Sequence, residues 1–441
     1  MAGPESHGQS AFREHLPDPS SPRFVTMRSQ DPRQYAQTFR DGRSPPWLHA
    51  LYTHWQRLHA EPFKGITSDG VVRPGLFGLE DQGVPIGRIV DAANCAVAEM
   101  DETQRRRVRH HIDSPEWRSW SNPEFLLSDK GIRLDEVSDS LRDAVMQVLR
   151  AALSPEGYDK AVAAMRINGF LGELVQAPAI MNERSYNFVL FGDAPSTTRP
   201  WGFSLYGHHL CINAFFYKTQ MVLSPCFTGA EPNAIDAGPY RGTRILHDEE
   251  ALGLRLMRGL APEMRHRAQT YTQMRDPAMP RGRWNHDDQR HLCGAFRDNR
   301  VVPYEGVCLG HVRPSLQNLA SDIIAQFLLS LPARAREMRL AQARDWFHET
   351  YFSWIGPFEG GTDGDDDNDD GGGPAFYYRI QSPVVLVEFD HHSGVFLTND
   401  QPARFHIHTI LRTPNAGDYG MALRPLVSGV QQDFVWEGEA S

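Results

Sequence analysis

The stretch that decides the fold is YNFVLFGDAPSTTRPWGFSLYGHHLCINAFFYKTQMVL, residues 186–223. Aromatic and aliphatic residues fill four short runs, which are Tyr186–Phe191, Trp201–Tyr206, Leu210–Phe216 and Gln220–Leu223. Residues that favour turns or end strands interrupt these runs at Gly192, Pro195, Gly207 and Lys218. Short runs of this composition, separated by turn residues, predict an antiparallel meander of strands.

The pattern is helical before the meander, from Pro46 to about Val175. Within it, Ile86–Met100 spaces its apolar side chains near 3.6 residues, and Asp101 followed by Gln104 predicts the start of another helix. After the meander, helices are predicted at Asp248–Leu260 and Pro314–Trp354, and strands at Phe376–Ile380, Val384–Phe389, Gly394–Leu397 and Arg404–Leu411. This order predicts an α+β fold, in which an N-terminal helical part packs on a mainly antiparallel mixed sheet with further helices.

Composition shifts divide the chain. Residues 1–45 are rich in Pro, Ser, Arg and Asp and predict a disordered N-terminal arm. Residues 46–420 predict a single domain, mostly helical over 46–175 and built of sheet plus helices over 186–420, and residues 421–441 form a C-terminal tail. Residues 360–373 are a low-complexity acidic insertion. A calcium loop would need a glutamate at its twelfth position and flanking helices, so a solvated surface insertion is favoured.

The totals of the 441-residue chain exclude several classes of protein. Hydrophobic residues make up 40% and the formal net charge is −10, without a strong Lys/Arg run, so we predict no nucleic-acid partner. Five widely spaced cysteines without a CxxC argue against a disulfide scaffold and a zinc ribbon. The absence of an apolar run of about 20 residues predicts no membrane span. With no secretion signal in the sequence, we predict a cytoplasmic protein.

His406-Ile407-His408 is the sharpest chemical signal in the sequence. Side chains at i and i+2 of a strand point to the same face, so both imidazoles can bind one metal ion while Ile407 faces the other side. Two surface histidines on a half-exposed strand are the competing interpretation.

His208-His209 and Glu388 are further candidate ligands. A regular strand would offer only one of two adjacent histidines to a given site, whereas a bulge at Gly207 could re-aim both. Glu388 follows four aliphatic residues, where a buried carboxylate needs a metal, an arginine or a proton. The alternative is a strand-end glutamate that reaches solvent. We therefore predict a metal site built from His208, His209, Glu388, His406 and His408.

Other residues are candidates for binding and catalysis around this site. Glu231 and Arg412 are predicted as catalytic, because Glu231 lies in a turn bounded by Gly and Pro and Arg412 can clamp an acidic group. The predicted substrate-binding residues are Trp201, Tyr378, Arg379 and Tyr419. A purely structural role is the alternative for each of them. The signatures GxSxG, Walker A, HExxH and GxGxxG do not occur, which removes the main support for serine hydrolases, P-loop proteins and Rossmann enzymes.

Several motifs together resemble domain-of-unknown-function family 3500, found in bacteria and fungi. They are Trp201-Gly202, Gly207–Leu210, Pro225–Pro232, Tyr377–Ile380, His406–Thr409 and Asp418–Gly420. The resemblance covers roughly residues 45 to 420 and implies one continuous family domain, but it implies no reaction.

From the residues, we expect a metal-dependent enzyme that acts on a small molecule, with an acidic group favoured by Arg379 and Arg412. The expected cofactor is a divalent ion of zinc, iron, manganese or copper, because imidazole and carboxylate ligands suit all four. Hydrolysis by a metal-activated water is preferred. The alternatives are a metal-dependent oxidoreductase, a metal-free acid–base isomerase or lyase, and a ligand-binding protein without catalysis.

Overall fold

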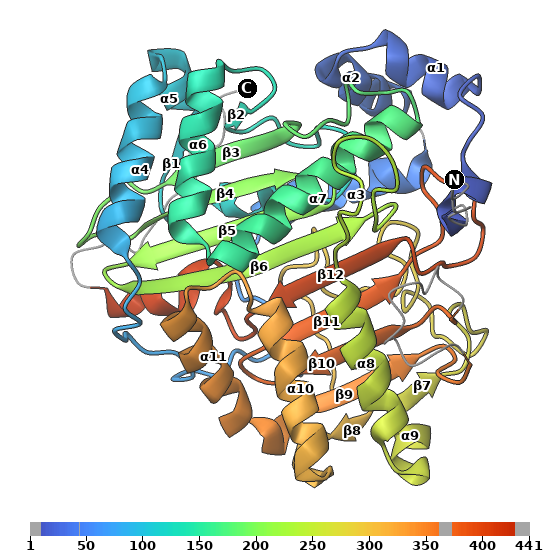
Figure 1. Ribbon diagram of the computed structural model, residues 1–441. Coiled ribbons are helices and arrows are strands. Elements are labelled where there is room, and N and C mark those ends of the chain that lie inside the picture. The colour runs from blue at the N-terminus through green and yellow to red at the C-terminus, as the bar shows by residue number, and fades with distance from the viewer. Residues whose placement is uncertain (1–9, 44, 361–372, 428–441) are drawn as a thin grey trace, which may run out of the picture.

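The structure is a computed structural model that describes residues 10–43, 45–360 and 373–427. Its strands form one sheet of twelve, mixed but mostly antiparallel, so the predicted α+β class is confirmed (Figure 1). The strands are β1 (Arg109–His110), β2 (Ile132–Arg133), β3 (Tyr186–Phe191), β4 (Trp201–Gly207), β5 (Leu210–Tyr217), β6 (Gln220–Ala230), β7 (Gln269–Tyr271), β8 (Val307–Cys308), β9 (Tyr351–Ile355), β10 (Tyr377–Gln381), β11 (Leu386–His391) and β12 (Ile407–Arg412).

The sheet has two halves that meet at one seam. Its order is β1-β3-β4-β5-β6-β12-β11-β10-β9-β7, with β2 beside β3 and β8 beside β9. The predicted meander forms β3 to β6, and the later strands form the other half. Antiparallel pairing of β6 with β12 joins the halves, with Gly229 opposite His408. This seam brings together strands that lie about 180 residues apart in the sequence, and the candidate site lies on it.

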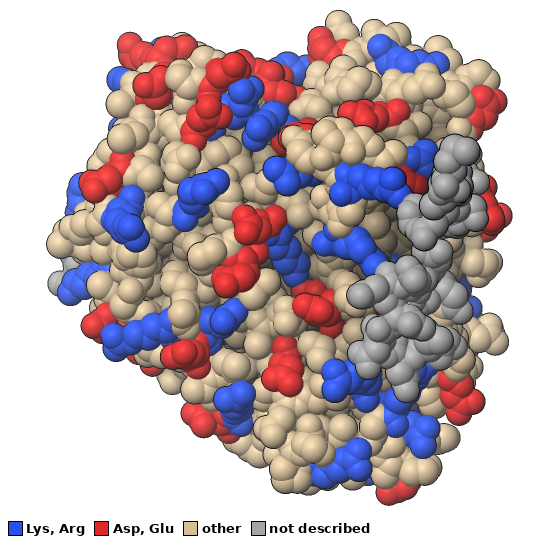
Figure 2. Space-filling view, viewed as in Figure 1, with Lys and Arg blue, Asp and Glu red and all other residues tan. Residues whose placement is uncertain are grey.

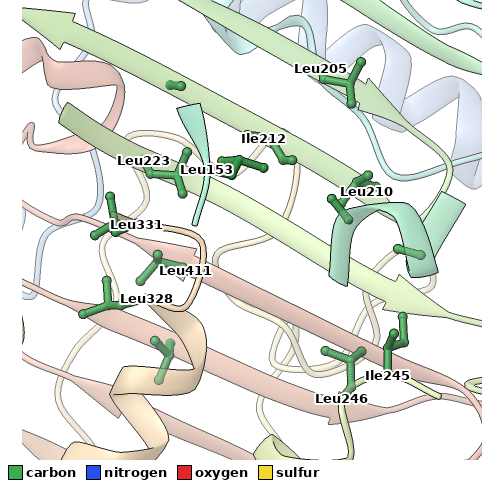
Figure 3. Packing of buried hydrophobic residues seen from close by; sticks show 14 of the residues in the cluster. Leu153, Leu205, Leu210, Ile212, Leu223, Ile245, Leu246, Leu328, Leu331 and Leu411 are labelled. Carbon is green, nitrogen blue, oxygen red and sulfur yellow. The ribbon is translucent and has the colours of Figure 1, made fainter. Parts of the chain in front are cut away.

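Helices cover one face of the sheet (Figure 1). They include α4 (Ile86–Glu99), α6 (Asp139–Ala152), α7 (Pro155–Leu174), α8 (His247–Gly259), α10 (Pro314–Phe327) and α11 (Ala333–Asp345), with the shorter α5 (Glu102–Val108) and α9 (Pro262–Ala268) beside them. Leucines and isoleucines of the strands and of neighbouring loops and helices form the core between these layers (Figure 3). Successive side chains of a strand point to opposite faces of the sheet. In β12, Ile407 and Leu411 therefore pack into this core, whereas Ile410 packs into a second one.

The second core lies under the N-terminal segment. The prediction that this segment is disordered is wrong for the residues that the structure describes. Residues 10–43 contain η1 (Ala11–His15), α1 (Pro22–Ser29) and α2 (Pro32–Gly42), followed by α3 (Pro46–His59). The prolines that suggested disorder occupy the first turn of these helices. A backbone N–H there has no partner within the helix, so its absence in proline costs no helical hydrogen bond. Asp31 and Gln34 form a capping box, and Phe24 and Met27 pack into the second core.

Smaller corrections follow from tertiary packing. The helix predicted to run to Trp354 ends with α11 at Asp345, and Tyr351–Ile355 is instead β9, paired with β10. Gly394–Leu397 is a loop and not a strand, because its backbone N–H groups bind a side chain. The predicted cap at Asp101 is confirmed as a capping box with Gln104. Most of the acidic insertion and residues 428–441 of the tail lie outside the described residues, whereas residues 421–426 belong to η5 (Asp418–Leu426).

The outer face of the helical layer carries Lys/Arg and Asp/Glu side chains interspersed, without a large area of one sign (Figure 2). In the described parts of the chain, no helix has both the length and the hydropathy of a membrane span.

The packing of α8 on β10 gives a first testable prediction. A Cβ added at Gly253 would lie 2.2 Å from Cε1 of Tyr378, whose hydroxyl donates to the Glu249 carbonyl and holds the ring in place. We therefore expect Gly253→Ala to lower the free energy of unfolding by about 1–3 kcal/mol, measured by urea denaturation.

Gly87→Ala is the matched control, because a Cβ there meets nothing within 4 Å. It should leave stability unchanged or raise it by up to about 1 kcal/mol. A Gly253→Ala protein as stable as Gly87→Ala would contradict this close packing.

Candidate metal centre

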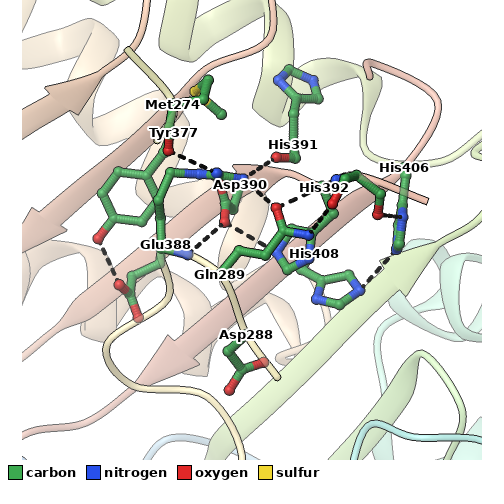
Figure 4. Close-up of polar contacts among 12 residues, drawn as sticks. Met274, Asp288, Gln289, Tyr377, Glu388, Asp390, His391, His392, His406 and His408 are labelled. Carbon is green, nitrogen blue, oxygen red and sulfur yellow. Dashed lines mark hydrogen bonds and ion pairs between the residues drawn. The ribbon is translucent and has the colours of Figure 1, made fainter. Parts of the chain in front are cut away.

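Three buried histidines converge at the seam of the sheet. His209 is the second residue of the two-residue turn between β4 and β5, His406 directly precedes β12, and His408 lies on β12. Nε2 of His408 lies 3.2 Å from Nε2 of His209 and 3.2 Å from Nε2 of His406. Figure 4 shows His406 and His408 turned toward each other. Of the predicted ligands, the structure thus brings together His209, His406 and His408.

The separations of these nitrogens suit a metal ion. One ligand atom from each of the three residues lies within 4.8 Å of the others. In a tetrahedral zinc site with bonds of about 2.0–2.1 Å, ligand nitrogens lie roughly 3.3 Å apart. Two imidazole nitrogens that both carry lone pairs repel at such a distance unless a proton or a cation lies between them. The arrangement is therefore one that a cation would stabilise.

Hydrogen bonds orient the rings. His406 Nδ1 lies 2.9 Å from the Ser393 carbonyl oxygen. A carbonyl only accepts, so Nδ1 carries the proton and Nε2 presents its lone pair. Such a bond to the outer nitrogen is typical of metal-binding histidines, because it fixes the tautomer and the ring orientation. His408 Nδ1 is buried without a hydrogen-bond partner among the described residues.

A glycine makes room for the cluster. Gly229 of β6 donates its N–H to the His209 carbonyl at 2.7 Å and pairs with His408 in the neighbouring strand. A Cβ at this position would lie 2.9 Å from Cδ2 of His209 and 3.1 Å from Cδ2 of His408. Two imidazoles can therefore lie side by side here only because residue 229 has no side chain.

Burial keeps these histidines neutral. Desolvation lowers the pKa of His209 and His408 well below 6.5 and also lowers the pKa of His406. Neighbouring imidazoles add to this effect, since each would repel a second positive charge. Neutral imidazole is the form that binds metals, so these three rings could bind a cation at neutral pH.

Two further histidines, His392 and His291, adjoin the triad. The ring of His392 lies 3.8 Å from that of His408, and desolvation lowers its pKa to about 3. Its Nε2 lies 3.0 Å from Asp390, which Arg290 holds through an ion pair. His291 is fully buried, and both of its ring nitrogens lack a hydrogen-bond partner within the described chain.

A cavity of about 700 Å³ opens onto the triad, and His208, His209 and His408 are part of its lining. Asp288 also lines this cavity. Desolvation and the neighbouring Asp287 raise the pKa of the Asp288 carboxyl to about 7. A carboxyl with this pKa can both accept and donate a proton near neutral pH. Sequence reasoning missed Asp288, because its environment comes from loops and strands far along the chain.

His208, Glu388 and Glu231 lie elsewhere than predicted. The His208 ring stacks on that of His209, with ring centroids 3.8 Å apart, but its Nδ1 lies 2.9 Å from Asn168 Oδ1 and it is not part of the triad. Glu388 binds the N–H groups of Leu292 and Cys293 and the Tyr377 hydroxyl, so its carboxylate fixes a loop (Figure 4). Oε1 of Glu231 accepts hydrogen bonds from the backbone N–H groups of Val395, Phe396 and Leu397. The same oxygen lies 3.7 Å from His406 Nδ1.

The other predicted site residues lie outside the cavity lining. Arg412 is saturated by Asp298, Asp418 and two carbonyls, and Arg379 binds Glu305 and a carbonyl. Tyr419 accepts a hydrogen bond from Trp120. Trp201 and Tyr378 pack in the core on the helical face. Nε1 of Trp201 and Nη1 of Arg379 are buried without a hydrogen-bond partner in the described chain. The predicted binding and catalytic roles of these five residues stay predictions.

Comparison with known proteins identifies one family. The model for "Protein of unknown function (DUF3500)" matches residues 82–421, which confirms the resemblance seen in the sequence motifs. No curated protein and no solved structure was found to match the chain.

The buried histidines predict how stability depends on pH in metal-free protein. For His208 and His392 burial lowers the pKa to about 3, below the unfolded value of 6.5, and the triad shifts in the same direction. The unfolded chain then binds protons that the folded chain excludes, so stability falls as pH drops below about 6.5, by up to about 1.4 kcal/mol per pH unit for each histidine. Urea denaturation in chelator between about pH 7.5 and pH 4.5 measures this slope.

Asp288 opposes that trend, because its raised pKa gives stability that is lost as pH rises through about 7. One carboxyl does not outweigh five imidazoles, and Asp288→Asn should steepen the acid decline. The triple variant His209→Gln/His406→Gln/His408→Gln should flatten it, whereas His266→Gln on the exposed side of α9 should not. An unchanged slope in the triple variant would show that the triad titrates normally.

Proposed function

The chain belongs to the DUF3500 family of proteins of unknown function, and we propose that it is a metal-dependent enzyme that hydrolyses a small molecule. The proposal rests above all on one observation: Nε2 of His408 lies 3.2 Å from Nε2 of both His209 and His406, beside a cavity that His209 and His408 line. His209, His406 and His408 would hold a divalent ion, with zinc as the first candidate. His208, His291 and His392 adjoin the triad, and no carboxylate belongs to the ligand group in the described chain.

Three protein ligands leave one position of a tetrahedral ion for water or substrate. A zinc ion held by the three histidines would lower the pKa of a water at that position to about 7 and polarise a carbonyl. His209 and His408 belong to the cavity lining, so an ion held by them would lie next to a substrate in the cavity.

Asp288 is the candidate general base and acid. Its carboxyl lines the same cavity, and its pKa of about 7 suits proton transfer at neutral pH. In ester or amide hydrolysis, Asp288 would take a proton from the attacking water. It would return that proton to the oxygen or nitrogen that leaves when the bond to the carbonyl carbon breaks.

A metal-dependent oxidoreductase remains the second candidate, because three imidazoles also bind iron, manganese or copper. The ligand set favours hydrolysis. Non-haem iron oxygenases commonly use two histidines and one carboxylate, whereas the triad consists of histidines alone and Glu388 is engaged by two backbone N–H groups and Tyr377.

Metal content tests the site directly. After reconstitution with zinc and dialysis, wild-type protein is expected to retain about one equivalent, measured by plasma mass spectrometry. His406→Ala/His408→Ala removes two of three ligands and should retain almost none. Gly229→Ala keeps all three ligands but crowds their rings, so we expect its affinity to fall by about 10–100-fold.

His208→Gln is the matched control, because His208 adjoins the triad but binds Asn168. It should retain zinc as the wild type does. The proposal is wrong if the wild type and the double variant hold equal zinc, or if the wild type retains none of zinc, iron, manganese or copper.

The role of Asp288 is tested by its amide. Asp288→Asn keeps the shape of the side chain but cannot accept a proton, so we expect kcat for 4-nitrophenyl acetate to fall by about 10²–10⁴-fold. Zinc content should not change, because Asp288 is not a ligand. Asp288→Glu should recover part of the rate, and a full rate in Asp288→Asn would exclude Asp288 as the base.

A further inference from the structure

The cavity has a floor, where His209 and His408 lie, and a wall, formed by residues of the N-terminal helices. The floor and the wall come from different parts of the chain. The floor histidines lie within residues 82–421, the part that the family model matches. By contrast, α1, α2 and α3 precede this part and contribute Arg23, Phe39, Trp47, Leu48 and Leu51 to the lining. An N-terminal segment outside the family match therefore closes the site on one side.

This wall is apolar and aromatic. Phe39 lies with its ring centroid 4.6 Å from that of Phe125, which also lines the cavity. Trp47 is 36% exposed and lies parallel to His286, with ring centroids 6.0 Å apart. Leu48 and Leu51, on the same face of α3, complete the wall. An exposed tryptophan beside a cavity offers an apolar surface that a ligand can cover.

Several polar and charged groups along the cavity are engaged with other groups of the protein. Arg23 binds the Val395 carbonyl and lies 3.5 Å from Glu124. Arg290 forms its ion pair with Asp390, and Gln289 binds Ser393. Since these groups already have protein partners, the wall offers a ligand mainly apolar contact, and Asp288 and the triad supply the polar chemistry at the floor.

We propose, on the basis of the hydrolytic function proposed above, that the substrate carries an apolar, ring-bearing body that packs against Phe39 and Trp47, and that the N-terminal helices thereby determine specificity. A cavity of about 700 Å³ accommodates a bicyclic ring system together with a carbonyl group at the floor. Aromatic walls favour rings over alkyl chains, because offset stacking adds to the burial of apolar area.

Binding of two amides tests this proposal without relying on turnover. Isothermal titration calorimetry on the full-length protein should show 2-naphthamide binding at least about tenfold more tightly than acetamide, because the ring buries apolar area. Trp47→Ala and the half-buried Phe39→Ala should each weaken 2-naphthamide binding by about five- to tenfold and leave acetamide binding unchanged.

Trp346→Ala is the matched control, because Trp346 also stacks on a histidine, His348, but is not part of the cavity lining. It should bind 2-naphthamide as the wild type does. Zinc content is measured in the same samples, so a failure of the metal site is seen separately. Equal affinities for the two amides, or 2-naphthamide binding that neither wall variant weakens, would overturn the proposal even where zinc binds as expected.

Discussion

The antiparallel pairing of β6 with β12 is the contact on which the candidate site depends. It sets Gly229 opposite His408, and the Gly229 N–H holds the carbonyl of His209. One short stretch of backbone thus places the hairpin turn of the first half of the sheet against the first residues of β12. The register also matters, because a shift of one residue would turn His408 to the helical face of the sheet.

Burial of so many imidazoles is a cost that the fold must offset. A buried polar atom without a partner loses about 1–3 kcal/mol of solvation, and His291 and His408 both have such atoms in the described structure. Some neighbours are satisfied within the protein, as His208 is by Asn168. The triad differs, because its nitrogens face one another, and a cation would satisfy all three together. A cation bound by the proposed site would therefore also stabilise the fold.

The sequence predicted what depends on local pattern. Alternating and aromatic runs located the meander, and the i, i+2 spacing of His406 and His408 predicted that both imidazoles share a site. Properties that depend on distant partners could not be predicted: Arg412 resembles a free clamp until Asp298 and Asp418 are seen beside it. Asp288 could not be identified from the sequence, since its raised pKa arises mainly from burial, which depends on the tertiary fold. The N-terminal prolines suggested disorder, because a proline at the start of a helix and a proline in a disordered segment cannot be distinguished from the local sequence. The difference lies in the apolar core against which these helices pack.

The division of the cavity into floor and wall has a physical consequence for how such a site can change. Floor residues lie on or beside the central strands, where a substitution disturbs strand pairing as well as chemistry. Wall residues lie on helices that pack against the sheet through side chains alone, and Trp47 is already partly exposed. A change at the partly exposed Phe39 or Trp47 would alter what the cavity accepts at less cost than a change at the buried Leu48 or Leu51, because exposed substitutions affect stability less than those in a core. The fold thus separates the residues that would perform a reaction from those that would select its substrate.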